Sequence, residues 1–202
     1  DVYKRQVYLD GTIYTAREGV YTRVLDEGKN LPLDLPSVSV ANFHCSPAAT
    51  QYHDGSFELG AVTATASFRF SKWIGRWLET SGAKLIIGKG GMSSQDYRDH
   101  FVPQGAIYLT TVGYGTGALL GRGVKQVVDL FWKKELGLAQ AMWVIEVENF
   151  GPFIVECDNT GNSLFERENA IIAKRLDEVY ADTKPAVLKR LGETNDRKDE
   201  MI

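Results

Sequence analysis

Residues 83–92 read AKLIIGKGGM, an apolar strand that runs directly into a loop of glycines around one lysine. Glycine lacks a Cβ, so such a loop turns with positive φ and lets the backbone come close to a ligand. The strand then presents Lys89 as a fixed cation, a group that binds anions. Taken alone, the stretch is equally compatible with a tight turn that carries a solvated lysine.

A second segment lies upstream, where residues 62–70 read VTATASFRF. The ten residues that follow it carry apolar side chains at helical spacing, so we expect a helix to begin here. If the entry is helical, Thr65 and Arg69 lie on one face, and a helix N-terminus favours bound anions. The alternative is that Thr65 is a helix cap, the more frequent role of such a hydroxyl, and Arg69 a surface charge.

A third segment, residues 9–18, reads LDGTIYTARE and predicts a strand and a turn that end at Arg17. Together the three segments resemble the β subunit, or C-terminal domain, of the class I fumarases and L-tartrate dehydratases, which are iron–sulfur hydro-lyases. The family pattern Gly-Lys-Gly-Gly-Met matches Gly88–Met92 in full. Its run Gly-x-(Ile/Leu)-x-(Thr/Ala)-(Ala/Cys), which precedes an Arg-Asp turn, matches Gly11–Arg17 up to the arginine. Its Gly-Pro-Thr-Thr-x-x-Arg-Met pattern matches residues 63–70 in part.

The resemblance covers roughly residues 7–170, and the stretches 143–152 and 158–164 resemble the family's C-terminal strands. The chain also departs from the family pattern. Glu18 replaces an aspartate, Tyr21 stands where the family usually has a histidine, and Thr63-Ala64 replaces Gly-Pro. Ala66 and Phe70 replace a threonine and a methionine.

The resemblance implies an α/β fold of the swivelling β/β/α type, in which a β layer packs on a helix-covered sheet. It implies the reversible dehydration of a hydroxy-dicarboxylate of the malate/fumarate or tartrate type. Arg17, Arg69, Lys89 and Gly90 would bind the substrate carboxylates, and the catalytic residues would be Lys89 and the proposed base, Thr65. Cations beside a carboxylate stabilise the charge that builds up when the neighbouring carbon loses a proton.

A threonine hydroxyl needs a neighbouring proton acceptor to act as a base at neutral pH. The sequence offers no evident acceptor, so we expect a carboxylate from a partner and an active site at the junction of two units. The resemblance implies that this partner is an α subunit, in an (αβ)2 assembly.

The cysteine count bears on the cofactor. A [4Fe–4S] cluster needs three or four thiolates, and the chain has two cysteines, Cys45 and Cys157. This chain therefore cannot hold such a cluster alone, and we predict no metal ligands in it. The resemblance implies that the cluster belongs to the α subunit. A weak metal pair of His44 and Cys45, with His53 nearby, is an alternative.

Two idle cysteines suit a reducing compartment, so we expect a cytoplasmic protein.

Composition is that of a globular protein, with 202 residues, 44% of them hydrophobic and 24% charged. A net charge of −3 gives no electrostatic footprint for nucleic acid, and no apolar run is long enough to span a membrane. We expect one domain over residues 1–182 and a charged tail over 183–202. The chain does not begin with methionine, and we expect its native N-terminus to be missing or replaced.

Hydrophobic patterning predicts alternating strands and helices, which favours an α/β fold. The predicted strands cover residues 7–15, 37–43, 56–62, 83–87, 105–112, 141–148 and 153–157. The predicted helices cover residues 68–81, 93–101, 116–136 and 163–182.

Two other functions stay open. The departures at Tyr21 and Thr63-Ala64 suggest a binding or regulatory relative that has lost catalysis. Residues 113–121 read GYGTGALLG after a predicted strand, which is similar to a dinucleotide-binding fingerprint, but the glycine spacing differs and no acidic residue follows where a ribose would need it. Close packing of strand and helix explains these glycines more simply.

Overall fold

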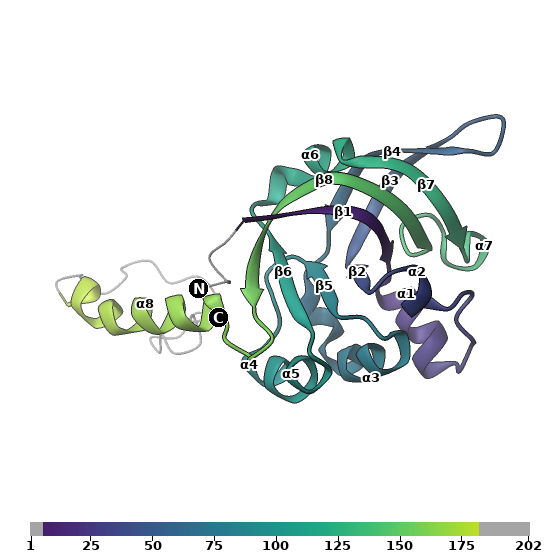
Figure 1. Cartoon of the computed structure of the whole chain (residues 1–202). Coiled ribbons are helices and arrows are strands. Elements are labelled where there is room, and N and C mark those ends of the chain that lie inside the picture. The colour runs from purple at the N-terminus through teal and green to yellow at the C-terminus, as the bar shows by residue number, and fades with distance from the viewer. Residues whose placement is uncertain (1–5, 182–202) are drawn as a thin grey trace, which may run out of the picture. The chain divides into compact units, whose positions relative to one another are not determined.

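The computed structural model describes residues 6–181 of the chain (Figure 1). The strands are β1 (Gln6–Thr15), β2 (Ala41–Phe43), β3 (Cys45–Gln51), β4 (Phe57–Ala64), β5 (Leu85–Gly88), β6 (Ile107–Thr111), β7 (Val124–Phe131) and β8 (Met142–Cys157). The α-helices are α1 (Glu18–Tyr21), α2 (Leu35–Val38), α3 (Ser71–Ser81), α4 (Ser94–Asp96), α5 (Val102–Gln104), α6 (Gly117–Arg122), α7 (Lys133–Leu136) and α8 (Leu164–Tyr180). Single turns of other helix types are η2 (Thr22–Asp26), η3 (Ser67–Phe70), η4 (Tyr97–Phe101) and η5 (Tyr114–Thr116).

Six strands form one curled sheet in the order β1-β2-β5-β6-β8-β7. The pairs β1–β2, β2–β5 and β5–β6 are parallel, and β8 runs antiparallel to its neighbours. Because β8 also pairs with β1, five of the strands close into a ring, and β7 lies against β8 outside it (Figure 1). The carboxyl ends of β1, β2 and β5 therefore meet at one edge of the sheet.

The two faces of the sheet have separate hydrophobic cores. Successive residues of a strand point to opposite faces, and Ile86 packs in the core beneath α3 whereas Ile87 packs in the other. Helix α3 contributes Trp73, Ile74, Trp77 and Leu78, which recur at helical spacing and are all buried. The second core is covered by the β3–β4 hairpin, whose strands contribute buried side chains such as Val62. Each fully buried large side chain contributes about 1.5–3 kcal/mol.

The α/β class is confirmed, but some predicted elements were wrong. Residues 116–136 form no single helix: the helix ends at Arg122, and β7 follows. The prediction gave too much weight to apolar content, while the β-branched residues Val124, Val127 and Val128 favour a strand beside β8. The predicted strands 141–148 and 153–157 are one bent strand, β8, and the predicted strand 37–43 begins with the α2 turn. Strand β3 was not predicted.

The helix expected at 68–81 is present as η3 followed by α3, but Thr65 lies before it in extended structure. The proposed shared helix face of Thr65 and Arg69 is therefore wrong. Glycines 117 and 121 lie in α6 against β4, where a Cβ at position 121 would collide with the backbone carbonyl of Gly60. Packing thus explains these glycines of the dinucleotide-like stretch, as the simpler interpretation predicted.

One compact unit ends at Glu166, and a second unit begins at Arg167 within α8. The expected tail at 183–202 lies outside the described residues. None of the helices within residues 6–181 is long and apolar enough to cross a membrane.

Candidate functional site

Three segments that carry predicted site residues meet at the carboxyl edge of the parallel strands. Arg17 follows the end of β1 and precedes the first residue of α1. Lys89 follows the last residue of β5, and Thr65 follows the last residue of β4. In α/β sheets, ligands bind at this edge, outside the carboxyl ends of the parallel strands.

A side-chain hydrogen bond joins Arg17 and Thr65. Nη1 of Arg17 donates to Oγ1 of Thr65 over 3.2 Å, and Nε of Arg17 is buried without a partner among the described residues. Burial lowers the pKa of Arg17, and the positive charge of nearby Arg69 lowers it further, against the opposing influence of Cys45 and Glu18. The guanidinium group of Arg69 is therefore close enough to affect the charge of Arg17.

Arg69 also forms an ion pair with Glu18, in which Nη2 lies 3.4 Å from Oε2. Both side chains are about half exposed, at 50% and 48%. A pair this exposed contributes little to stability, about 0–1 kcal/mol. It matters here because it shows where the positive charge of Arg69 lies. The arginine remains accessible to a ligand that approaches from solvent.

Backbone hydrogen bonds hold Thr65 beside Lys89. The N–H of Lys89 donates to the carbonyl of Thr65 over 3.2 Å, and the N–H of Ser67 donates to the carbonyl of Lys89 over 3.1 Å. Thr65 is fixed on its other side, where its N–H donates to the carbonyl of His44 over 2.6 Å. The structure thus brings the predicted residues Arg17, Thr65, Arg69 and Lys89 to one edge of the sheet.

The glycine loop has two kinds of constraint. Gly90 and Gly91 have φ angles of +84° and +109°, which residues with a Cβ rarely adopt. Gly88 is required for a different reason, since a Cβ there would collide with the hydroxyl groups of Ser67 and Tyr108. Gly90 has open space around it, as expected of a position where the backbone faces a ligand.

Sequence reasoning missed a group of buried polar side chains beneath these residues. They are Tyr21, Asn42, His44, Ser67 and Tyr108, all with no exposed surface. Sequence had pointed to His44 only as half of a weak metal pair. In the structure, both ring nitrogens of His44 hydrogen-bond to hydroxyl groups, and burial, with a smaller effect of Arg17, lowers its pKa to about 3. The metal-pair alternative is therefore not supported.

The side chains present do not fit an iron–sulfur cluster. Cys45 and Cys157 are free and buried, and they belong to the cores on opposite faces of the sheet. Burial raises the pKa of both thiols, which disfavours the thiolate form that ligates iron. Among the side chains that the structure describes, no three His, Cys, Asp or Glu residues gather to hold a metal ion.

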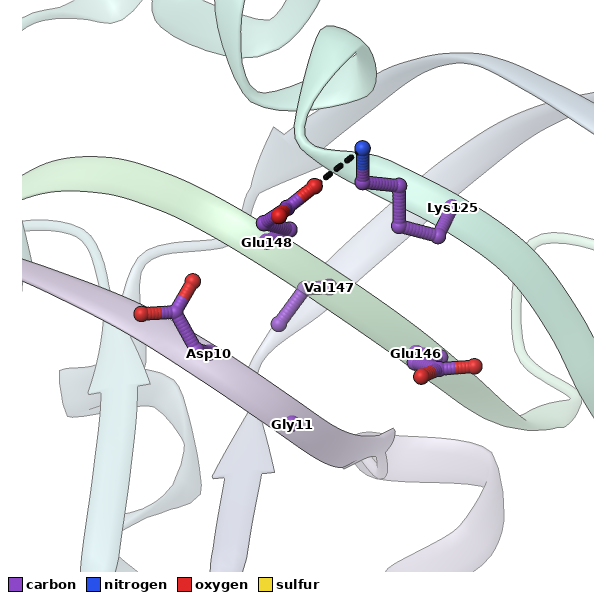
Figure 2. A pocket seen from close by; sticks show the side chains of 6 residues that line it. All are labelled: Asp10, Gly11, Lys125, Glu146, Val147 and Glu148. Carbon is purple, nitrogen blue, oxygen red and sulfur yellow. Dashed lines mark ion pairs between the residues drawn. The ribbon is translucent and has the colours of Figure 1, made fainter.

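A shallow pocket of about 410 Å³ lies elsewhere, on β1, β7 and β8 (Figure 2). It is lined by Asp10, Gly11, Lys125, Glu146, Val147 and Glu148, and Lys125 forms an ion pair with Glu148. Three carboxylates and one ammonium repel a dianion, and none of the predicted site residues lines the pocket. The cationic edge at Arg17, Thr65 and Lys89 is the better candidate site.

Comparison with known proteins identifies the family of the chain. The family model described as the fumarase C-terminus matches residues 2–168. The chain belongs to this family. The three motif segments that converge at the candidate site all lie within the matched region.

Relatives of this chain include stand-alone and longer proteins. The chain is 34% identical over 176 residues to a protein of Methanocaldococcus jannaschii, provisionally named L(+)-tartrate dehydratase subunit beta, covering 86% of this chain and 88% of that protein. It is 30% identical over 178 residues to the L(+)-tartrate dehydratase subunit beta of Escherichia coli strain K12, covering 87% and 85%. It is 31% identical over 165 residues to a protein of Geobacillus stearothermophilus provisionally named fumarate hydratase class I, covering 79% of this chain but 30% of that longer protein.

Proposed function

We propose that this chain is the β subunit of an iron–sulfur-dependent hydro-lyase that reversibly dehydrates a hydroxy-dicarboxylate of the malate/fumarate or tartrate type. The observation that carries the proposal is the hydrogen bond from Arg17 to Thr65, with the cations Arg69 and Lys89 at the same edge. Two carboxylates require several positive groups in one place, and the loss of a proton requires one group that accepts it. This edge of the sheet offers the positive groups and the Thr65 hydroxyl, which would exchange the proton once a further acceptor activates it.

Arg17 has a donor left for the substrate. Nε is buried out of reach of a ligand and Nη1 donates to Thr65, so the remaining Nη2 group of this half-buried side chain would bind a carboxylate. The planar guanidinium suits this because it presents its donors in a fixed fork. Arg69 and Lys89 would hold the remaining carboxylate oxygens. These contacts strengthen as proton removal builds negative charge on the adjacent carboxylate.

Thr65 would exchange the proton on the substrate carbon. A guanidinium has no acceptor atom, so Arg17 favours the negatively charged form of the Thr65 hydroxyl but does not take its proton. A further acceptor is needed, and we assign it to an α subunit that covers this edge. We assign the residues of this chain no role in the departure of the substrate's hydroxyl group.

An α subunit would also supply the cluster and exclude water. Phe68, next to Arg69, is 65% exposed, and an exposed aromatic beside a half-exposed cationic site suits the contact surface of a partner. The longer fumarate hydratase relative, of which this chain covers 30%, is consistent with two units in one reaction. We further propose an (αβ)2 assembly, the swivelling β/β/α form of the fold and a cytoplasmic location, which suits free thiols.

The test is to produce the chain with a cysteine-bearing α subunit, load the cluster without oxygen, and assay malate, fumarate and L-tartrate. Arg69→Ala would lower turnover by about 100-fold, whereas the matched control Arg76→Ala, whose ion pair with Asp26 lies away from the site, would leave turnover near normal. An assembled complex that holds a cluster and turns over none of these acids would contradict the proposal and favour a non-catalytic relative.

A further inference from the structure

A continuous chain of hydrogen bonds runs through the protein beneath the candidate site. Nδ2 of Asn42 donates to the Tyr21 hydroxyl over 2.8 Å, and that hydroxyl lies 2.6 Å from Nε2 of His44. Nδ1 of His44 lies 2.8 Å from Oγ of Ser67, and the Tyr108 hydroxyl donates to the same Oγ over 2.7 Å. The five side chains come from segments spread over residues 21–108, and all are buried.

Two hydrogen bonds in this chain have a fixed direction: Asn42 donates to the Tyr21 oxygen, and Tyr108 donates to Oγ of Ser67. The direction of the two bonds of His44 depends on which ring nitrogen of the neutral imidazole carries the proton. Burial raises the pKa of Tyr21 and Tyr108, so both keep their protons. In either tautomer, Oγ of Ser67 is bonded to both His44 and Tyr108.

The same serine holds the two segments that carry the proposed chemistry. Its backbone N–H donates to the carbonyl of Lys89, whose N–H donates to the carbonyl of Thr65. Its hydroxyl, with that of Tyr108, occupies the space that a side chain at Gly88 would need. Tyr108 also hydrogen-bonds to the backbone of Gly91 on the far side of Lys89. The buried chain therefore contacts the lysine loop before and after Lys89.

We propose that Ser67 and the buried chain Tyr21–His44–Ser67–Tyr108 position Thr65 and the Gly88–Met92 loop relative to each other. Ser67 is a positioning residue that acts through Thr65 and Lys89 and does not itself touch the substrate. The effect on turnover rests on the proposed function, whereas the effect on the loop does not. Misplacement of reacting groups by about 1 Å lowers rates by up to about 100-fold, so small shifts in this loop are measurable.

The test uses Ser67→Ala in the assembled enzyme. We expect kcat to fall by about tenfold or more while KM changes by less than about threefold, because Arg17 and Arg69 still bind the carboxylates. Residue-resolved hydrogen exchange should show faster exchange of the Lys89 and Gly91 amides. The Gly82 amide is an internal reference, since it donates to the carbonyl of Leu78 at the end of α3, outside the loop and this chain of bonds, and its exchange should not change.

Tyr21→Phe provides a second variant if Ser67→Ala fails to fold. It removes the hydroxyl that hydrogen-bonds to His44 and should shift kcat and loop exchange in the same direction. Its matched control is Tyr14→Phe, the same chemical change at a buried tyrosine of the same core that takes no part in the chain of bonds. Control kinetics and exchange should equal those of the unmodified protein.

Two results would overturn the inference. One is unchanged exchange at Lys89 and Gly91 in both Ser67→Ala and Tyr21→Phe. The other is a loss of activity in Tyr14→Phe equal to that in Tyr21→Phe, which would make the effect one of general stability. If the unmodified assembly turned over no hydroxy acid, the proposed function would fail, and the exchange data would still decide whether the chain positions the loop.

Discussion

Arg17 and Thr65 are 48 residues apart in the sequence, and a 3.2 Å hydrogen bond from Nη1 to Oγ1 joins them at the carboxyl edge of the sheet. The arginine is half-buried by the ends of β1 and α1, and the threonine is held by backbone bonds to His44 and Lys89. A cation and a hydroxyl fixed by separate parts of the fold form a preorganised site, and each partner can be tested alone.

Thr65→Ala should abolish turnover of the assembled enzyme and leave binding of a substrate-like dicarboxylate inhibitor within a few-fold of normal. In the proposed function the hydroxyl exchanges the proton, whereas the cations bind the carboxylates, so kcat and affinity should separate. Thr50→Ala, in the exposed part of the hairpin, is the control. Loss of inhibitor binding would instead show that Thr65 has a structural role.

Lys89→Ala should lower kcat/KM by about 100-fold or more, equivalent to about 3 kcal/mol of transition-state stabilisation. The reason is the loss of a positive charge near the carboxylate on which negative charge develops. Lys84→Ala, at the other end of the same β-segment, removes an ammonium that donates to the Gln104 carbonyl and should leave kinetics unchanged. Near-normal turnover of the Lys89 variant would exclude the assigned role.

Gly88→Ala should reduce the free energy of unfolding by about 1–3 kcal/mol, because a methyl group there overlaps the hydroxyls of Ser67 and Tyr108. Gly60→Ala is the control, since no atom lies within 4 Å of its Cβ position and the change should stay within about 0.5 kcal/mol. Denaturant unfolding of both variants measures the difference. Equal stability of the two would mean that the loop moves aside without cost.

Stability should depend on the protonation of His44. Burial lowers its pKa from 6.5 to about 3 in the folded state, so between these pH values the unfolded chain binds a proton that the folded protein does not. Stability from this group is therefore present above about pH 6.5 and is lost as pH falls towards 3, by up to about 1.4 kcal/mol per pH unit. Denaturant unfolding at several pH values measures this slope.

His44→Gln should be less stable at neutral pH but should show a shallower fall in stability on acidification. Other titrating groups contribute equally to both proteins, including Glu156, whose pKa burial raises. The difference between the two slopes therefore isolates His44. Parallel profiles of stability against pH would show that His44 binds its proton as readily in the folded protein as in the unfolded chain.

Phe68→Asp should weaken association with the α subunit by about tenfold or more, because an exposed aromatic beside the site would be replaced by a charge that must be desolvated in the interface. Val128→Asp changes another exposed apolar residue, on β7, and should leave association unaffected. Analytical ultracentrifugation of the mixed subunits measures both. Equal effects of the two variants would point to general instability.

The sequence predicted those parts of the candidate site that are contained in short contiguous motifs. Gly88–Met92 alone is equally compatible with a tight turn and became interpretable through its full match to the family pattern, and the structure places that loop at the carboxyl end of β5. Arg17 and Thr65 were predicted through resemblance, and their hydrogen bond was not foreseen. The helix-face relation of Thr65 and Arg69 was wrong because the backbone stays extended to pair with Lys89.

The buried polar chain could not be predicted because its members are ordinary residues when viewed one at a time. Tyr21 stood out only as a departure from the family's usual histidine, Tyr108 lay unremarked within a predicted strand, and Ser67 was part of a run of small and hydroxyl residues. Only the pairing of strands brings them together around His44. Strand β7 could not be predicted for the same reason. Residues 124–131 form a strand rather than continue the helix because they pair with β8, which lies further along the chain.

The pairing of the first strand with the last has a consequence for biosynthesis. Thr15 accepts a backbone hydrogen bond from Trp143 and donates to the carbonyl of Ala141, so the segment that ends in Arg17 is fastened by residues made more than 120 positions later. A nascent chain on the ribosome therefore carries every cation of the site before it can arrange them. Contacts so distant in sequence slow folding, and the strand pairing that fastens β1 beside the candidate site can be completed only after β8 has been synthesised.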